Sequence, residues 1–475
     1  MEKDNNILGS APVSKLLRMF SIPCVLSLVI SALYNLVDQI FIGHKAILGA
    51  DGNAATGVIY GLTVIALGFG LWIGDGAASL MAISQGKNDT TSTAKRVGNS
   101  ITLGVIMGVL LTFICFIFKD SILPLLGGTG NILTLANDYS FYIFIGFTVY
   151  IVGSLINPII RADGSPIFAM VAMSLGAIVN IILDPIMLYV FDMGMEGAAL
   201  ATLIGQVVTF IVSIAYLFRA KTFKLKFSDF ILRRDFTLVY KYGISSFLTQ
   251  FSIFLITAVN NAILKEISIN SGYSPAITMG AITLAFKVFG IIVSVAIGIV
   301  SGGAPIIGYN YGARKYDRVK EALKLIIICA AVVGIIATIL FEACPKLFLL
   351  IFGDGGDSVD KASYEAFVYK TFRIYLALIL PTVLIKVISV FFQAIAMPVK
   401  STLITSLRDV IFLIPLAVSF GLLGGVDLFL WSAPIADLLG LIVAVSFLIP
   451  ELKKLGKKED VINEINLAYS SGETL

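Results

Sequence analysis

Long apolar segments dominate this sequence, and they limit the folds open to it more than any other feature. Each has about the 20 residues that an α-helix needs to cross the hydrocarbon core of a bilayer. The chain is 58% hydrophobic and only 13% charged, whereas soluble domains carry about 25% charged residues. We therefore expect an all-α polytopic membrane protein with twelve transmembrane helices, at about 18–42, 54–84, 97–118, 138–161, 166–191, 197–218, 242–265, 277–307, 320–342, 368–396, 401–421 and 428–449.

Basic residues alternate between the predicted loops. Lys and Arg gather before the first span, at 87–96, in the segment 219–241, at 314–324, at Lys400 and after the last span, and they are few in the loops that alternate with these. Cytoplasmic loops carry such an excess, so we expect both termini in the cytoplasm and the chain in the inner (plasma) membrane. The same bias accounts for the net charge of +4 without a nucleic-acid partner. The expected partners are the lipid bilayer and a small molecule, with the protein as a monomer.

Metal, cofactor and nucleotide signals are missing from the sequence. The four cysteines have no metal-ligand spacing, the single histidine is His44, and no GxxxxGK[ST] loop occurs. We therefore expect no cofactor and no enzyme activity. The energy for any transport must come from an ion gradient.

The chain repeats itself with a shift of about 226 residues, because the glycine-rich segment 76–86 resembles the segment 302–312. Each half holds six predicted helices, as in transporters built from two parallel repeats around a central site. This predicts an N-lobe at 1–218, a basic cytoplasmic linker at 219–241, a C-lobe at 242–450 and a cytoplasmic tail at 451–475.

One carboxylate, Asp38, lies inside the first apolar span. An acid within a membrane helix costs several kcal/mol, on the order of translocon scales, and occurs mostly where it faces a cavity. Tyr34 lies one turn earlier on the same face and Asn35 lies beside it, so both are candidates for the cavity lining.

The fifth span supplies a second acid in the sequence Asn180-Ile-Ile-Leu-Asp184-Pro. Residues four apart share a helix face, so Asn180 and Asp184 could join Asp38 in an oxygen-rich pocket. Asn157 and Thr202 could add ligands. Such a site can exchange a proton or hold a sodium ion among its oxygens. The alternative is that Asp184 lies at a helix end in contact with water.

The repeat fails at these acids. With the lobes aligned, Asp38 falls near Asn260-Asn261, and Asp184 falls on Ile414. We therefore expect the ion chemistry in the N-lobe only. Within the second lobe, Lys287 either lines the substrate cavity or extends its amine to the membrane interface.

Together, several motifs resemble the multidrug and toxic compound extrusion (MATE) family over nearly the whole chain. They are Tyr34-Asn-Leu-Val-Asp-Gln-Ile-Phe-Ile-Gly43, Asn157-Pro, Arg161-Ala-Asp-Gly, Asn180-Ile-Ile-Leu-Asp-Pro185 and Pro305-Ile-Ile-Gly-Tyr-Asn-Tyr-Gly-Ala313. The resemblance implies two pseudo-symmetric six-helix bundles forming a V around a central cavity. It also implies export of organic cations or other drugs in exchange for protons or sodium ions.

The acids of the first lobe resemble those of the family's DNA-damage-inducible (DinF-like) branch. That resemblance implies a cation site at Asp38, Asn180, Asp184 and Thr202, and a bend of the first helix at Pro23. Other branches have an acid in the seventh helix, where this chain has Asn260-Asn261.

Three other functions would fit parts of the pattern. A flippase for lipids or lipid-linked oligosaccharides of the same superfamily would need a strongly cationic cavity, but only Lys287, Lys386 and Arg408 are available. A membrane-embedded enzyme would need a catalytic cluster, which the single histidine disfavours. A channel would show flux without coupling to an ion gradient.

Overall fold

The computed structural model describes residues 7–45, 48–87, 89, 91–232, 236–352 and 361–471, and these residues form helices and loops without a strand. The chain divides into two compact units. Residues 22–254 form the amino-terminal unit, and residues 1–21 together with 255–475 form the carboxyl-terminal unit. The helix α2 begins in the carboxyl-terminal unit and continues into the amino-terminal one, whereas α9 runs the opposite way.

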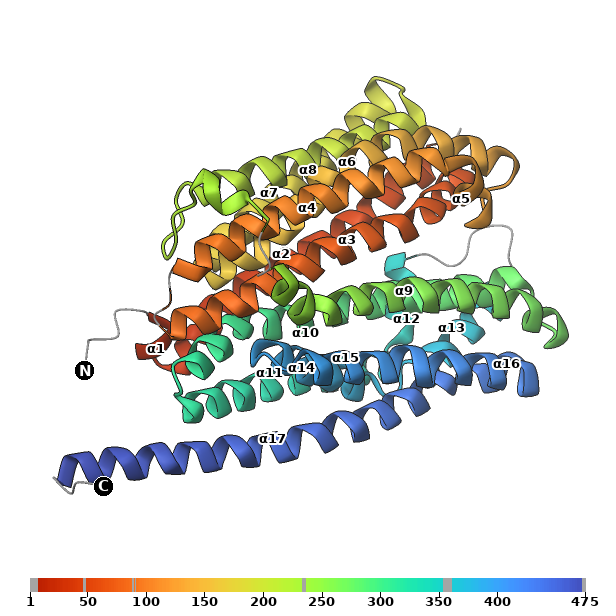
Figure 1. The fold of residues 1–475 in the computed structure, drawn as a ribbon. Helices are drawn as coiled ribbons and strands as arrows, with labels where there is room; N and C mark the ends of the chain where they lie inside the picture. The colour runs from red at the N-terminus through yellow and green to blue at the C-terminus, as the bar shows by residue number, and fades with distance from the viewer. Residues whose placement is uncertain are drawn as a thin grey trace. The chain divides into compact units, whose positions relative to one another are not determined.

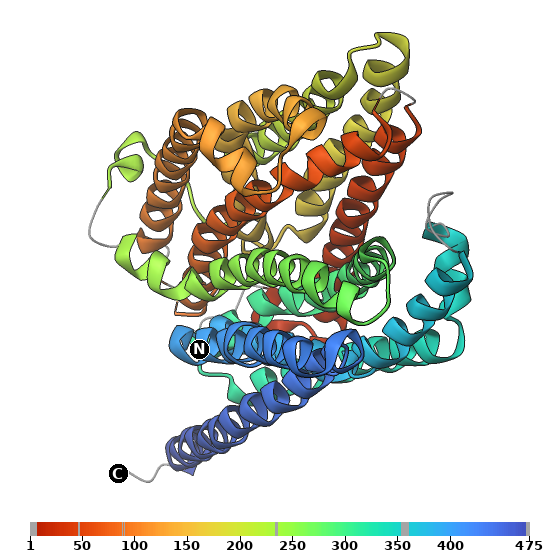
Figure 2. The ribbon, with the colours of Figure 1, turned by 90° about the vertical axis from the view of Figure 1, so that its right-hand side faces the viewer.

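The amino-terminal unit is organised around α6, which packs against α3, α4, α7 and α8 (Figure 1, Figure 2). Most of the carboxyl-terminal half of α6 is buried, from Ile151 to Ala162. The elements of this unit are α2 (Val13–His44), α3 (Gly49–Gly86), α4 (Thr91–Ile117), α5 (Lys119–Leu125), α6 (Gly130–Ala162), α7 (Pro166–Pro185), η1 (Ile186–Val190), α8 (Gly194–Leu217) and η2 (Phe227–Phe230).

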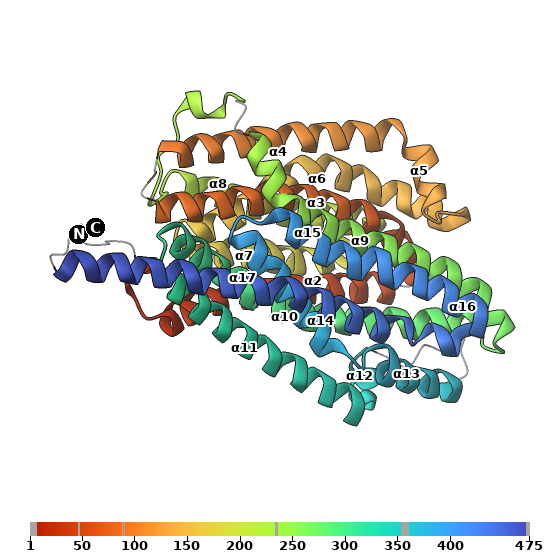
Figure 3. The ribbon, with the colours of Figure 1, turned by 60° about the horizontal axis from the view of Figure 1, so that its bottom comes forward.

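The carboxyl-terminal unit has a core of α10, α11, α14 and α17, which pack against one another in neighbouring pairs. The shorter α12 and α13 lie near the carboxyl end of α11 (Figure 3). The elements are α1 (Ile7–Ser10), α9 (Phe236–Asn270), α10 (Pro275–Gly312), α11 (Tyr316–Ala343), α12 (Pro345–Phe352), α13 (Lys361–Tyr375), α14 (Ile379–Ala394), α15 (Pro398–Ser406), η3 (Leu407–Leu413), α16 (Ile414–Phe429) and α17 (Ser432–Ser471).

The internal repeat predicted from the sequence appears in the irregular features as well as in the helix order. A short helix follows the third long helix in both halves, as α5 and α12. A π-helical segment interrupts the fifth in both, as η1 and η3. The left-handed glycines Gly194 and Gly425 are 231 positions apart in the sequence. The two units are therefore pseudo-symmetric, and the predicted lobe boundaries remain predictions.

Eleven helical stretches of the described chain are long and apolar enough to cross a membrane, and one bent pair makes twelve if it is a single span. The bent pair is α13 and α14, which meet at 48°. The span predicted at 368–396 is therefore bent. Pro381 explains why α14 begins here, because proline fits the first turn of a helix but breaks its interior.

Two glycines let α3 and α9 cross closely within the amino-terminal unit. A Cβ atom on Gly243 would lie 1.7 Å from the carbonyl oxygen of Trp72, and one on Gly76 would lie 2.2 Å from that of Val239. The indole Nε1 of Trp72 donates to the Tyr240 carbonyl at 2.8 Å across the same crossing. The first half of α9 therefore packs on α3 through close backbone approach, and the ring of Trp72 also contacts Tyr240 and Phe247.

Candidate functional site

Four of the predicted site residues come together in the amino-terminal unit: Asp38 of α2, Asn180 and Asp184 of α7, and Thr202 of α8. The amide Nδ2 of Asn180 donates to Asp184 Oδ1 at 3.2 Å and to Thr202 Oγ1 at 3.4 Å. The carboxyl groups of Asp38 and Asp184 interact with each other electrostatically. Helices separated in the sequence thus bring two acids, one amide and one hydroxyl into a single cluster.

Three oxygen atoms of this cluster are buried without a hydrogen-bond partner among the described residues: Asp38 Oδ1, Asn180 Oδ1 and Asp184 Oδ2. Asp184 is 0% exposed and Asp38 is 8% exposed. A buried acceptor without a donor is costly, and two adjacent carboxylates repel each other unless a proton or a cation lies between them. The free acceptors therefore make this cluster a candidate site for a positively charged ligand.

Local sequence explains the geometry of the cluster. Asn180 and Asp184 are one turn apart, which places both side chains on one face of α7. A Cβ atom on Gly205 would lie 2.7 Å from the Gly176 carbonyl oxygen and 3.0 Å from Asn180 Cβ. The absence of side chains at this crossing lets α8 approach α7, so that Thr202 reaches Asn180.

The fifth span changes its hydrogen-bonding pattern directly after the acid. Pro185 ends α7 and has no amide hydrogen to donate, and the π-helical segment η1 follows it. Single-turn π-helical segments inside membrane helices often lie at functional sites. The backbone next to Asp184 therefore differs from a continuous α-helix, as the Asp-Pro pair in the sequence indicates.

Two tyrosines lie near the carboxylates. Tyr34 is one turn before Asp38, and its hydroxyl interacts electrostatically with both Asp38 and Asp184. The hydroxyl of Tyr139, from α6, lies near Thr202 and interacts electrostatically with both acids. The sequence predicted Tyr34 from its helical spacing. It gave no comparable signal for Tyr139, which comes from a different helix.

The remaining predicted residues lie outside this cluster. Asn35 is exposed, and its Nδ2 donates back to the Ser31 carbonyl of its own helix at 2.8 Å. Both polar atoms of the Asn157 amide are hydrogen-bonded: Nδ2 donates to the Ala169 carbonyl at 2.9 Å, and Oδ1 accepts from Arg161. Pro23 lies inside α2, two residues after the unit boundary, and Lys287 lies on α10 in the carboxyl-terminal unit.

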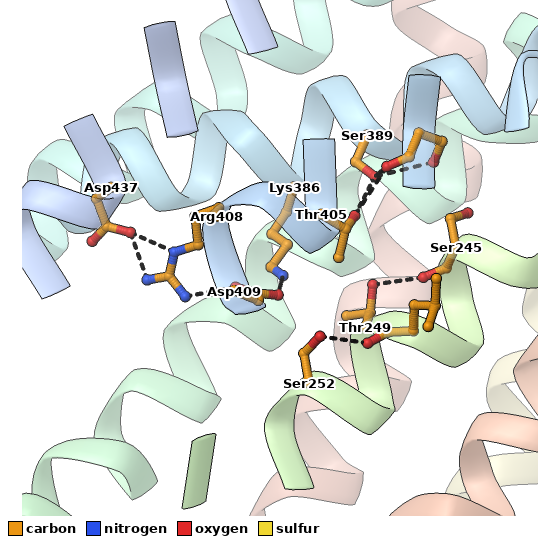
Figure 4. Close-up of polar contacts among 11 residues, drawn as sticks. Ser245, Thr249, Ser252, Lys386, Ser389, Thr405, Arg408, Asp409 and Asp437 are labelled. Carbon is orange, nitrogen blue, oxygen red and sulfur yellow. Dashed lines mark hydrogen bonds and ion pairs between the residues drawn. The ribbon is translucent and has the colours of Figure 1, made fainter. Parts of the chain in front are cut away.

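The carboxyl-terminal unit contains a different buried cluster, drawn in Figure 4. Arg408 of η3 contacts Asp409 through NH1 at 2.7 Å and Asp437 of α17 through NH2 at 2.5 Å. Lys386 of α14 contacts the other oxygen of Asp409 at 2.8 Å. All four side chains are between 2% and 11% exposed.

The two clusters differ in charge. In the carboxyl-terminal unit, two cations neutralise two carboxylates, and the cluster is closed by its own hydrogen bonds. In the amino-terminal unit, the pair Asp38 and Asp184 has no basic partner within hydrogen-bond reach among the described residues. Asn260, which the alignment placed opposite Asp38, donates to the Tyr375 hydroxyl at 3.3 Å. Free acceptors for a cation are thus found in the amino-terminal cluster.

The donor set of the amino-terminal cluster limits the cation that it can hold. The described residues contain no group of three or more His, Cys, Asp or Glu side chains arranged to bind a metal ion. Two carboxylates with an amide and a hydroxyl oxygen suit a proton or a sodium ion, which transporters take up at such buried oxygen sites.

Named relatives of this chain are multidrug exporters. The "Multidrug export protein MepA" of Staphylococcus aureus is 25% identical over 365 residues, covering 74% of this chain and 77% of MepA. MepA of Staphylococcus saprophyticus is 25% identical over 426 residues, covering 88% of this chain and 89% of that protein.

Solved structures share the fold at lower sequence identity. An outward-facing multidrug resistance MATE family transporter of the MOP superfamily has a TM-score of 0.85 at 24% identity, covering 95% of this chain and 98% of that one. A MOP superfamily transporter from Pyrococcus furiosus has a TM-score of 0.86 at 23% identity with the same coverage. The profile of the MatE family matches residues 23–186 and 242–423. Because this match covers well over half of the chain, the protein belongs to the MatE family, whose members are membrane transporters rather than enzymes.

Proposed function

We propose that this transporter exports drug-like small molecules, organic cations or others, across the plasma membrane in exchange for protons or sodium ions. The family assignment supports transport, and the names of the staphylococcal relatives support drugs as the cargo. Coupling to an ion gradient is supported by the amino-terminal cluster, since it offers acidic groups buried in apolar helices.

One observation carries the coupling proposal: Asp38, Asn180 and Asp184 each keep an oxygen atom buried without a donor. A structural cluster would be expected to satisfy its own acceptors, as the network around Arg408 does. Hydrogen-bond acceptors without a donor inside an apolar helix bundle instead suit a ligand that binds reversibly. A proton or a sodium ion supplies the missing positive charge, and Asn180 and Thr202 orient the carboxyl groups.

The difference between the open amino-terminal cluster and the neutralised carboxyl-terminal cluster defines the proposed transport cycle. Loading a proton or a sodium ion removes one negative charge from the carboxyl pair and stabilises one arrangement of α2, α7 and α8, and releasing it restores that charge and favours another. Pro23 lacks an amide hydrogen and gives α2 a place to bend between these arrangements. The carboxyl-terminal unit needs no ion at its corresponding position, because Lys386 and Arg408 supply the positive charge permanently.

We also infer the family branch, the side of the membrane on which the termini lie, and the oligomeric state. The first-lobe position of the cluster favours the DinF-like branch, and the basic loops favour cytoplasmic termini. We expect the protein to act as a monomer.

The test is transport of ethidium in proteoliposomes with a proton gradient or a sodium gradient imposed separately. Accumulation should follow one of the gradients, and Asp38→Asn should abolish this coupling while the protein still inserts and folds. Asparagine keeps the shape of the side chain but cannot titrate. Full gradient-driven transport by Asp38→Asn, or wild-type flux that ignores both gradients, would contradict the proposal.

A further inference from the structure

The helix α10 of the carboxyl-terminal unit exposes polar side chains within a membrane span. Of its described side chains, over residues 277–312, only Thr283 and Lys287 are exposed. They are one turn apart and share a face. Lys287 lies 12 residues after the helix start at Pro275, about 18 Å along the axis of a helix about 57 Å long, and so away from both helix ends.

The exposed face of α10 is unlike a face that contacts lipid. Its neighbour α11 packs against α10 and exposes a run of large apolar side chains in its middle, between 48% and 58% exposed: Ile328, Val332, Ile335, Ile336 and Ile339. No large apolar side chain of the described part of α10 is exposed. A hydroxyl and an ammonium in these positions indicate contact with water or with a transported molecule.

The polar stripe continues along the helix. Gly290 and Ser294 follow Lys287 on the same face, and a Cβ atom on Gly290 would meet no other atom within 4 Å. The Ser294 hydroxyl donates to the Gly290 carbonyl at 2.8 Å. This face therefore borders open space over more than two turns of the helix.

The charge of Lys287 has no counter-ion among the residues that the structure describes. None of the described residues forms a hydrogen bond or an ion pair with it, and α10 contains no acidic residue. The helices α11 and α13, which pack against α10, have acidic residues only near their ends. These are Asp317, Glu321 and Glu342 near the ends of α11, and Glu365 near the start of α13. By contrast, Lys386 and Arg408 in the same unit are both neutralised.

The positive charge is also specific to one half of the repeat. The shift of about 226 residues aligns Lys287 with Gly61 of α3, and no charged residue occurs in α3 between Asp51 and Asp75. The repeat that builds the two units therefore does not require a lysine here.

We propose that Lys287 is a specificity-determining residue, which favours substrates carrying a carboxylate over purely cationic molecules of the same size. An unneutralised ammonium on a surface in contact with the transported molecule attracts an anionic group and repels a positive one. This inference rests on the proposed export of small molecules and ranks their classes, with zwitterionic or anionic drugs bound more tightly than purely cationic ones.

The test compares one drug skeleton with and without its carboxylate. Norfloxacin is the carboxylate probe, and its ethyl ester is the matched cation. Equilibrium binding of both probes to the purified protein is measured for the wild type, Lys287→Met and Lys287→Arg. Lys287→Met should shift the affinity ratio toward the ester by about tenfold, the change expected from a free-energy difference of about 1.4 kcal/mol, whereas Lys287→Arg should keep the wild-type ratio.

A second variant tests the position of the charge. Adding Thr283→Lys to Lys287→Met returns the ammonium to the same face one turn away, and it should restore part of the preference for the carboxylate. Lys287→Gln replaces Lys287→Met if the latter does not fold. An affinity ratio within twofold of the wild type in the neutral variant would overturn the inference.

Binding and transport separate this inference from the proposed function. A shifted binding ratio in a protein that shows no ion-driven transport would support the role of Lys287 and refute the proposed export. Ion-driven transport of both probes with an unchanged binding ratio in Lys287→Met would refute the role of Lys287 alone.

Discussion

Replacing Asp437 with asparagine should destabilise the carboxyl-terminal unit, because the change leaves Arg408 with one buried carboxylate in place of two. Asp437 Oδ1 accepts from Arg408 Nε at 2.7 Å and from NH2 at 2.5 Å. The side chains of Arg408 and Asp437 are only 7% and 5% exposed, so water does not replace the lost charge. The remaining network would hold two cations and a single anion.

The magnitude follows from the cost of breaking a buried ion pair, about 3–5 kcal/mol. Asparagine keeps an oxygen that can still accept from Arg408, so we expect the lower end, about 3 kcal/mol. For a unit of this size, the melting temperature should fall by about 6–12 °C. Asp184→Asn is the matched control. It removes a carboxyl group that has no basic partner, and its melting temperature should not fall below that of the wild type.

The two tryptophans of the chain allow each unit to be followed separately, since Trp72 lies in the amino-terminal unit and Trp431 in the carboxyl-terminal one. Thermal unfolding of the purified protein is followed by fluorescence in Trp72→Phe and Trp431→Phe backgrounds. The signal from Trp431 should shift in Asp437→Asn. A melting temperature within about 2 °C of the wild type for Asp437→Asn, less than about 1 kcal/mol, would refute the reasoning, as would an equal loss in Asp184→Asn.

Three further predictions follow from the structure. Asn180→Ala should reduce gradient-driven transport more than Asn260→Ala at matched expression, because only Asn180 contacts the carboxyl pair; equal losses would mean that both units share the ion pathway. Gly243→Ala should prevent accumulation of folded protein, since its Cβ would lie 1.7 Å from the Trp72 carbonyl oxygen, and a monodisperse, wild-type-like elution profile would contradict this. Pro23→Ala should keep substrate binding but slow the release of substrate driven by a pH change, and an unchanged release rate would exclude bending at Pro23.

The sequence predicted those features that depend on local spacing. Apolar length located the spans, and the four-residue separation of Asn180 and Asp184 placed both on one helix face. The acid in the first span indicated Asp38. The span at 368–396 was located, but its bend was not predicted, because hydropathy does not register that Pro381 favours the start of a new helix.

Features that depend on contacts between distant helices were not predictable in the same way. Tyr139 reaches Thr202 from α6, and Asp437 reaches Arg408 from α17, and neither pair has a fixed sequence spacing. Asn157 was a candidate cation ligand because it is an amide inside an apolar span, but that amide is hydrogen-bonded to the Ala169 carbonyl and to Arg161. A polar residue inside an apolar span thus predicts a buried polar group. Only the hydrogen-bond partners of that group show whether it is free to bind a ligand.

The central claim is that the carboxyl pair of Asp38 and Asp184 holds the coupling ion, and the most direct measurement is ion binding to the purified protein. Proton release on substrate binding is recorded with a pH indicator in weakly buffered solution, and sodium binding is recorded in parallel with radioactive sodium. The wild type should release protons or bind sodium, and both Asp38→Asn and Asp184→Asn should lose that signal, whereas Asn260→Ala should retain it. A wild-type signal in Asp184→Asn would contradict the account.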